Sequence, residues 1–266
     1  MLALTSVGHF LAAILVAEAI AQPSCPRSTL PAYAHNDYEN SQPLFDALRL
    51  GYSGVEADVF LVNGVLRVGH DRRQARTGGT LEALYLTPLR EIVSRCRRLT
   101  ADNRGFLLTV EIKERSPATF DALLAVLDRY PELFMPVSAS RAPIELVLVG
   151  WHPPLSARRT TERARLGVQH RITAAAAVPP VPAEVRLLSV DFGKAIGRQW
   201  LRAADCRRWI ASLRAAKDAN PHRLVRVHNV PADSTIYGAL LDAGVDLIGT
   251  KDLIKTWQLL EGRQLR

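Results

Sequence analysis

Gly54-Val-Glu-Ala-Asp-Val-Phe60 is an apolar, β-branched run that is interrupted only by Glu56 and Asp58. A run of this composition predicts a largely buried strand. Val62-Asn-Gly-Val65 follows directly, and an Asn-Gly pair between apolar runs is a strong signal for a two-residue hairpin turn. We therefore expect a return strand over residues 65–70.

Further runs of the same kind lie on both sides of this hairpin, and stretches with helical periodicity separate them. The strand-like runs cover 31–36, 106–113, 145–150, 168–173, 186–191, 224–229 and 245–250. The helical stretches cover 41–50, 80–98, 117–130, 157–166, 200–219 and 233–243. Without the hairpin return, eight strands alternate with helices, and 266 residues suit one (β/α)₈ barrel. The sequence therefore predicts an α/β fold of the TIM-barrel type, as a single domain over residues 22–266.

The first residues have the pattern of a secretory signal peptide. Leu2 to Val16 is apolar and contains no Asp, Glu, Lys or Arg, and Ala19-Ile-Ala21 fits a small-residue cleavage site. A membrane anchor is the alternative, since no Lys or Arg precedes the run, but the run is short for crossing a bilayer. We therefore expect residues 1–21 to be a signal peptide, and a secreted or periplasmic protein that begins near Gln22.

Three cysteines remain after such a cleavage, namely Cys25, Cys96 and Cys206. None lies in a Cys-x-x-Cys pair, so the common zinc and thiol-redox motifs are absent. In an oxidising compartment the three allow one disulfide and leave one thiol over. A bond from Cys25 would tie the N-terminal arm to the domain, but the sequence leaves the pairing open.

The chain is basic, with a formal net charge of +8. Its arginines occur in scattered pairs, and no run interleaves them with aromatic residues, which make up 6% of the chain. This pattern argues against nucleic acid as a partner, because single strands are bound by basic grooves lined with aromatic side chains. A basic surface of this kind is either an ordinary solvated face or one that attracts anionic substrates and lipid surfaces.

Glu56 and Asp58 lie two residues apart on one strand, so their side chains point to the same face. A divalent cation would offset the repulsion between them; the alternative is that each faces solvent or pairs with an arginine. Glu111 and Lys113 repeat the spacing on the next barrel strand. Glu111 would be a third oxygen ligand and Lys113 would neutralise a substrate phosphate, unless the two form a simple salt bridge. Oxygen ligands of this kind predict one Mg²⁺ or Ca²⁺ rather than zinc.

Two histidines end strand-like runs, His35 in the first run and His70 in the hairpin return. Histidines that titrate near neutrality can take a proton from a nucleophile and give one to a leaving alkoxide, so we predict both as catalytic. The alternative is a turn residue at His35 and a surface residue at His70. With a two-residue turn, strict register places His70 opposite Ala57, on the face away from the carboxylates. A bulge or a break in pairing is needed to bring it to the metal.

Other polar residues lie at the expected mouth of the barrel. We predict Asn36, beside the first histidine, and His228, at the end of the seventh barrel strand, as substrate-binding residues. Further candidates at the same level are Trp151, His152 and Lys194. The chain has no Gly-x-Ser-x-Gly elbow, Walker loop or Gly-x-Gly-x-x-Gly motif, so it lacks the usual signatures of serine hydrolases and nucleotide-binding proteins.

Four motifs together resemble the glycerophosphodiester phosphodiesterase and phosphatidylinositol phospholipase C-like superfamily. They are His35-Asn-Asp37, Gly54-Val-Glu-Ala-Asp-Val59, Val68-Gly-His-Asp71 and Val110-Glu-Ile-Lys113. The form Ala34-His-Asn-Asp-Tyr38 is most similar to the branch that includes the altered inheritance of mitochondria protein 6 homologues. One departure is that Asn36 stands where the glycerophosphodiesterases carry an arginine.

The resemblance implies a TIM barrel with one Mg²⁺ or Ca²⁺ and phosphodiesterase activity. Residue by residue, it implies an acid–base pair, three metal ligands and a phosphate contact, namely His35 and His70, then Glu56, Asp58 and Glu111, then Lys113. We therefore expect a monomeric phosphoric diester hydrolase that acts on a small phosphodiester or a lipid head group and contacts membrane surfaces transiently. Attack by a neighbouring substrate hydroxyl would give a cyclic phosphate first. The alternatives are a non-catalytic barrel that binds phosphorylated head groups or a protein partner, and another metal-assisted hydrolase such as a phosphomonoesterase.

Overall fold

The computed structural model describes most of the chain beyond the predicted signal peptide. The described residues are Cys25, Leu99, and the ranges 30–96, 105–134, 142–155, 166–172, 179–195 and 203–264. The predicted signal peptide lies outside them. So does the predicted helix over 157–166, apart from Leu166, which begins a strand.

In the described part of the chain, eight parallel strands close into a barrel, as the sequence predicts. They are joined in the order β1 (Leu30–Ala34), β2 (Tyr52–Val62), β4 (Phe106–Ile112), β5 (Ile144–Gly150), β6 (Leu166–Ile172), β7 (Val185–Asp191), β8 (Leu224–His228) and β9 (Leu247–Thr250). Pairing of β1 with both β9 and β2 completes the circle. The prediction of a (β/α)₈ barrel is therefore confirmed.

The barrel interior is filled in layers, because alternate residues of each strand point inward. An apolar cluster comprises Tyr33, Leu107, Val147, Leu187 and Leu247. The next inward layer contains four buried polar side chains, two residues beyond Gly54, Leu107, Leu187 and Leu224 on β2, β4, β7 and β8; they are those of Glu56, Thr109, Ser189 and Arg226. Two residues further again, toward the carboxyl ends of the same strands, lie Asp58, Glu111, Asp191 and His228. The same period of two therefore builds the core and delivers polar groups to one end of the barrel.

The predicted hairpin is present. Strand β3 (Val65–Val68) pairs antiparallel with β2, and the turn residues Asn63 and Gly64 have φ angles of 51° and 77°. Positive φ at both positions is what a two-residue turn of this type requires, and Asn and Gly tolerate it. The return strand ends at Val68, two residues earlier than predicted.

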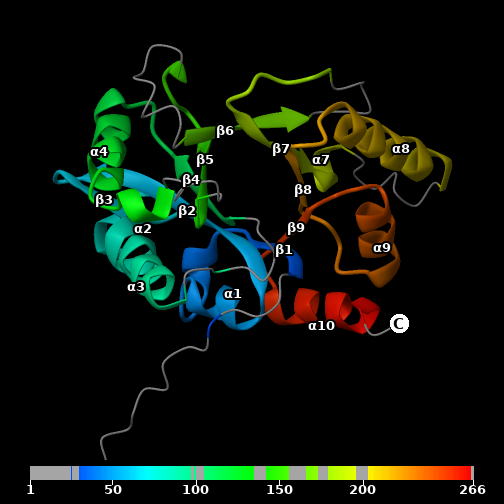
Figure 1. Ribbon diagram of the computed structural model, residues 1–266, viewed down its shortest axis with the longest axis horizontal. Coiled ribbons are helices and arrows are strands. Elements are labelled where there is room, and N and C mark those ends of the chain that lie inside the picture. The colour runs from blue at the N-terminus through cyan, green and yellow to red at the C-terminus, as the bar shows by residue number, and fades with distance from the viewer. Residues whose placement is uncertain are drawn as a thin grey trace, which may run out of the picture.

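Helices cover the outside of the barrel, with α3 and α4 on one side of the strands and α8 and α9 on the other (Figure 1). The longer described helices are α2 (Arg72–Thr77), α3 (Thr87–Cys96), α4 (Pro117–Leu127), α8 (Ala203–Ala219), α9 (Ser234–Asp242) and α10 (Leu253–Gln264). Short helical turns are η1 (Asp37–Glu39), α1 (Phe45–Arg49), η2 (Glu82–Leu86), α5 (Pro131–Phe134) and α7 (Phe192–Ala195). Side-chain caps begin α4 and α9, where Ser116 and Asp233 accept backbone hydrogen bonds.

Several predicted helices differ from the structure. The helix expected over 41–50 begins only at Phe45, because Leu44 has a φ of 67° and the preceding residues form a turn around the Asp46 carboxylate. The helix expected over 80–98 is preceded by the π-helical turn η2 before α3 begins. Helices α2 and α10 were not predicted, and α2 was missed because its sequence contains a single apolar residue, Ala75.

A disulfide joins Cys25 to Cys96, and Cys206 is a free thiol. The bond ties the N-terminal arm to the end of α3 across a sequence separation of 71 residues. The sequence left the cysteine pairing open, and the structure selects Cys25 with Cys96. Among the described helices, none is both long and apolar enough to cross a bilayer.

Candidate functional site

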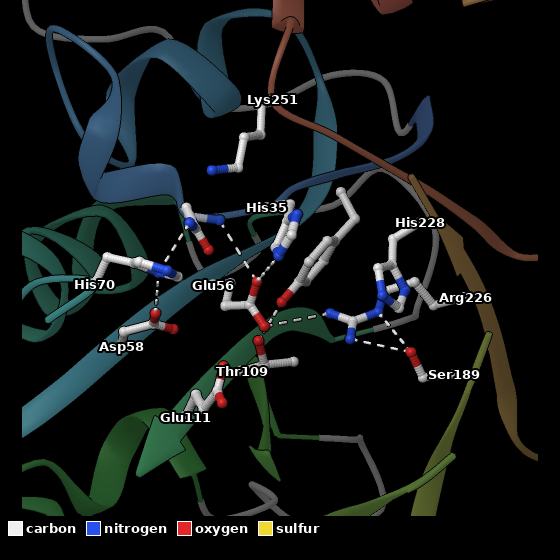
Figure 2. A network of polar contacts seen from close by, with 12 residues as sticks. His35, Glu56, Asp58, His70, Thr109, Glu111, Ser189, Arg226, His228 and Lys251 are labelled. Atoms are coloured by element: carbon white, nitrogen blue, oxygen red, sulfur yellow. Dashed lines mark hydrogen bonds and ion pairs between the residues drawn. The ribbon is translucent and has the colours of Figure 1, made fainter. Parts of the chain in front are cut away.

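The polar residues of the strand ends meet at one end of the barrel. Figure 2 shows them arranged from Asp58 and His70 on one side to His228 on the other, with His35 between. They lie near the carboxyl ends of β1, β4 and β8 and near the end of the part of β2 that pairs with β4, which is the end where TIM barrels carry their active sites. Closure of the barrel therefore brings residues that are far apart in the sequence together in one site.

Three carboxylates form the centre of this site. Glu56 and Asp58 are buried, Glu111 is half-buried, and each offers an oxygen within 4.8 Å of the others. Asp58 and Glu111 are register partners on β2 and β4. Burial and the neighbouring Glu56 raise the pKa of Asp58, because both disfavour a second negative charge. A cluster of this kind is costly without positive charge close by.

The two oxygens of Asp58 have different surroundings. Its Oδ2 lies 2.8 Å from the Tyr38 hydroxyl, 3.2 Å from Lys113 Nζ and 3.3 Å from His70 Nδ1. Its Oδ1 is buried and has no hydrogen-bond partner among the described residues. A buried carboxylate oxygen without a partner fits a metal ligand, because a bound cation would satisfy it. The donor set is all oxygen, which suits Mg²⁺ or Ca²⁺.

Lys113 lies between two of the carboxylates, with Nζ 3.2 Å from Asp58 Oδ2 and 3.6 Å from Glu111 Oε2. Burial opposes its charge, but the attraction of both carboxylates prevails and raises the pKa of Lys113. The salt bridge considered for Glu111 and Lys113 is therefore present in the structure. It leaves the ammonium group beside the carboxylates, where it can also face a substrate anion.

His35 approaches the site from the end of β1. Its Nε2 lies 3.3 Å from Glu56 Oε2, and its backbone N–H donates to the carbonyl of Thr250. Burial lowers the pKa of His35, and the nearby Glu56 opposes this shift. The next residue, Asn36, has a φ of 52° and directs its own N–H at Glu56 Oε2, 3.4 Å away. The end of β1 and the turn after it thus direct the His35 ring and the Asn36 N–H at the same oxygen of Glu56.

His70 reaches the site because strand pairing stops before it. The last register pair joins Val59 to Val68, after which the Gly69 N–H donates to the Asp58 carbonyl and the chain enters α2. A Cβ at Gly69 would lie 2.6 Å from the backbone nitrogen of Ala75, so the turn into α2 needs glycine there. His70 Nδ1 consequently lies 3.3 Å from Asp58 Oδ2 rather than on the far face. The break in strand pairing that His70 needs in order to reach the carboxylates is therefore present.

Arg226 is a buried residue of the site that was not predicted. Its Nη1 lies 3.6 Å from Glu56 Oε1, its Nη2 donates to Gln169 and Ser189, and its guanidinium stacks 4.5 Å over the Tyr33 ring. The arginine partner considered as an alternative for Glu56 therefore exists. An arginine between valines in the strand-like run Leu224-Val-Arg-Val-His228 was the signal for it.

The remaining candidates lie around this centre. His228 is close to His35, with ring centroids 5.6 Å apart, and Lys251, also not predicted, pairs with Glu39 at 2.9 Å above the site (Figure 2). Lys194 is exposed near Asp191. His152 Nδ1 lies 3.0 Å from the Pro153 carbonyl, and no described contact joins it to the carboxylates.

A segment within the N-terminal half of the chain matches a known family. Residues 26–133 match the family described as the AIM6-like phosphodiesterase domain. The expected resemblance is confirmed. Altered inheritance of mitochondria protein 6 of Saccharomyces cerevisiae (strain S288c) is 37% identical over 94 residues, which are 34% of this chain and 24% of that protein. A homologue of this protein from Arthroderma benhamiae is 36% identical over 72 residues, or 25% of this chain and 23% of that one. The matches thus span about a quarter of these curated relatives.

Solved structures support the barrel architecture of this chain. A glycerophosphodiester phosphodiesterase from Parabacteroides distasonis has a TM-score of 0.50 at 17% identity, over 91% of this chain and 100% of that one. A protein from Aquifex aeolicus has a TM-score of 0.52 at 11% identity, over 89% of this chain and 91% of that one. Identities this low show a shared fold. The segment that matches the family ends before β5, so Arg226 and His228 lie outside it.

Proposed function

We propose that this protein is a metal-dependent phosphodiester hydrolase. The observation that carries the proposal is the triad of Glu56, Asp58 and Glu111 with the unpartnered Oδ1 of Asp58, flanked by His35 and His70. The match of residues 26–133 to a phosphodiesterase domain supports the same reaction class.

Charge at the site agrees with a bound divalent cation and an anionic substrate. Three carboxylates face two permanent cations, Lys113 and Arg226, so the cluster keeps a surplus of negative charge. A divalent ion held by the three carboxylates would reverse the sign and polarise a phosphoryl oxygen. Lys113, already at the edge of the cluster, would contact a second phosphoryl oxygen. Asn36, whose side-chain amide lies 3.4 Å from His70 Nδ1, would offer that amide to the same substrate.

The two histidines would move the protons. One accepts the proton of the nucleophile, a water or a neighbouring substrate hydroxyl, while the bond from that oxygen to phosphorus forms. The other gives a proton to the ester oxygen as its bond to phosphorus breaks. His35 is held at Glu56 and His70 at Asp58, so each ring has its orientation set by a different carboxylate. Attack by a substrate hydroxyl gives a cyclic phosphate, whereas attack by water gives the monoester directly.

The test compares turnover with metal, with chelator and after a change to one ligand. A panel of generic, glycerol-based and lysophospholipid diesters is incubated with Mg²⁺, with Ca²⁺ or with chelator. Chelation should abolish turnover, and Glu56→Gln should lower it by at least about 100-fold. Metal should also stabilise the wild-type fold, by about 2.7 kcal/mol at one hundred times its dissociation constant, and Glu56→Gln should lose this effect.

The matched control is Glu132→Gln, an exposed carboxylate on α5, which should behave as wild type. Undiminished turnover in Glu56→Gln, or in chelator, would overturn the proposal. Tight binding of phosphorylated head groups by a folded, metal-loaded protein that turns over none of the diesters would identify a binding barrel instead.

We further propose that the protein is exported. The Cys25–Cys96 disulfide supports this, because such bonds persist mainly in oxidising compartments. Expression in a bacterial host with a periplasm, followed by N-terminal sequencing of the periplasmic product, should give a chain that begins near Gln22. A product that retains residues 1–21 and stays in the cytosol would contradict export.

A further inference from the structure

A buried arginine lies in the barrel interior, one layer beneath Asp58 and Glu111. Arg226 is 3% exposed and belongs to the same polar layer as Glu56. An arginine keeps its charge in proteins and is seldom buried this deeply unless it is paired. Replacing a buried ion pair with apolar residues is often neutral or even stabilising, so the stability of the fold gives little reason for a charge at this depth. The site above Arg226 supplies a better reason.

Neutral groups hold the guanidinium of Arg226 in place. Its Nε and Nη2 donate to Ser189 Oγ at 3.2 and 3.1 Å, and Nη2 also donates to Gln169 Oε1 at 2.7 Å. The Tyr33 ring lies against the guanidinium, with 4.5 Å between the ring centroid and Cζ. These partners come from β1, β6 and β7, so three other strands fix the group. They satisfy hydrogen-bond donors but supply no negative charge.

The third nitrogen of the guanidinium, Nη1, faces Glu56. It is buried without a hydrogen-bond partner among the described residues, and it lies 3.6 Å from Glu56 Oε1. That distance is too long for a hydrogen bond, so the two groups interact through their charges. Figure 2 shows the guanidinium approaching Glu56 from β8, with Asp58 beyond Glu56. No ion pair in the described chain joins Arg226 to Asp58 or Glu111, so it acts on the carboxylates through Glu56.

The surroundings transmit this charge with little screening by solvent. The side chains of Arg226 and Glu56 are 4% and 3% exposed, and charges in such surroundings interact several times more strongly than in water. With the histidines neutral, the three carboxylates, Lys113, Arg226 and a divalent ion together would carry one net positive charge. Without Arg226 the same groups would carry none. Arg226 therefore decides whether the loaded site is positive or neutral.

We propose that Arg226 is a positioning residue that sets the charge of the metal site from beneath. It holds Glu56, weakens binding of the cation itself, and leaves the loaded site positive toward a phosphodiester anion. The two effects have opposite signs because a fixed positive charge repels a cation and attracts an anion. The inference rests on the proposed function. It concerns a residue outside the segment that matches the AIM6-like family.

The test replaces Arg226 with methionine, which has a long side chain and no charge. Isothermal titration calorimetry on the apo proteins, with Mg²⁺ and with Ca²⁺ in turn, should show about tenfold tighter cation binding in Arg226→Met. Dimethyl phosphate, followed by ligand-observed NMR, should bind the Mg²⁺-loaded variant about tenfold more weakly. The kcat/KM for the best diester of the panel should fall by a similar factor. A role in packing alone predicts weaker binding of the cation and of the anion together.

Two further variants separate charge from shape. Arg226→Lys keeps the charge but loses the planar fork, and should bind both the cation and dimethyl phosphate within about threefold of wild type. Arg226→Gln has no charge but retains an amide that can bond to Ser189 or Gln169, and should behave like Arg226→Met. Failure of both neutral variants to fold, with or without metal, would assign Arg226 to the fold and overturn the inference.

Arg214→Met is the matched control, because it removes the same charge from an exposed position on α8. Solvent screens that charge, so cation and anion binding should stay within about twofold of wild type. Cation affinity that falls or stays the same in folded Arg226→Met would overturn the inference. So would an Arg226→Lys variant that matches Arg226→Met in both measurements.

Binding separates this inference from the phosphodiesterase proposal, because neither titration needs turnover. If no diester is hydrolysed, opposite changes in cation and dimethyl phosphate binding would still support the role of Arg226, although the hydrolase proposal had failed. If diesters are hydrolysed but the two affinities change in the same direction, the hydrolase proposal stands and the inference fails. A wild-type protein that binds neither cation would overturn both.

Discussion

The hydroxyl of Tyr38 donates a hydrogen bond to Oδ2 of Asp58 at 2.8 Å. Burial and the adjacent carboxylate raise the pKa of Tyr38, so the phenol stays protonated and remains a donor. Because Lys113 and His70 approach the same oxygen, Tyr38 helps to hold Asp58 with Oδ1 turned away from all three groups. Oδ2 of Asp58 thus contacts Tyr38, Lys113 and His70, whereas Oδ1 is free to bind a cation.

Tyr38→Phe should weaken metal binding while the fold is kept. Loss of one hydrogen bond to a charged group leaves Asp58 less well oriented, so we expect Mg²⁺ or Ca²⁺ affinity to fall by about three- to tenfold. Isothermal titration calorimetry on the apo protein measures this directly. Tyr130→Phe is the matched control, since that hydroxyl contacts Glu82 and Thr87 instead. Unchanged affinity in Tyr38→Phe would show that Asp58 needs no help from the phenol.

Asp37 should make the fold less stable as the pH rises through 6. It is fully buried, and burial raises its pKa to about 6, despite hydrogen bonds that include one from the Leu44 N–H. A carboxyl with a higher pKa in the folded than in the unfolded state binds its proton more tightly when folded. Its stabilising contribution is therefore complete below about pH 4 and is lost as the pH rises to about 6. The loss should be about 3 kcal/mol at most.

Urea unfolding at intervals between about pH 4 and about pH 7.5 measures this slope for wild type and Asp37→Asn. The amide cannot ionise, so the variant should lose the decline over that window and be the more stable protein at neutral pH. Asp218→Asn, at an exposed position on α8, serves as the control and should leave the slope unchanged. Identical slopes for wild type and Asp37→Asn would mean that another group titrates in this range.

Gly69→Ala should destabilise the protein and move His70. The added Cβ would lie 2.6 Å from the Ala75 nitrogen and 3.0 Å from Gln74 Cβ, so the backbone must shift at the point where β3 turns into α2. We expect a loss of about 1–3 kcal/mol in the free energy of unfolding, as for overpacked sites. A crystal structure of the variant should show His70 Nδ1 further than 3.3 Å from Asp58 Oδ2.

Gly262→Ala provides the comparison, because Gly262 lies in α10 and, apart from its chain neighbours and the backbone of its own helix, no described atom lies within 4 Å of the position that its added methyl group would take. It should raise stability by about 0.5–1 kcal/mol, as expected for alanine in a helix. If Gly69→Ala behaves like Gly262→Ala, the tight turn into α2 has no role in placing His70.

The barrel and its metal-ligand candidates could be read from the sequence, because both depend on local spacing. Buried parallel strands are continuous apolar runs, the Asn63-Gly64 turn needs positive φ angles, and residues two apart on a strand share a face. Glu56, Asp58 and Glu111 therefore appeared as a group before any contact between them was known. Helix α2 was missed because it is held by its Asp71 cap and by tertiary contacts rather than by an apolar stripe.

Only the tertiary structure decided which distant residues meet. The end of pairing at Val68 brings His70 to Asp58, and closure of the barrel places Arg226 of β8 against Glu56 of β2. The same closure sets the distance between His228 and Asp191, and the disulfide selects Cys96 as the partner of Cys25. Periodicity determines the face and the layer that a side chain occupies. Which charged group or ring lies next to that side chain depends on strand register and barrel closure, and both are set by contacts between segments that are far apart in the sequence.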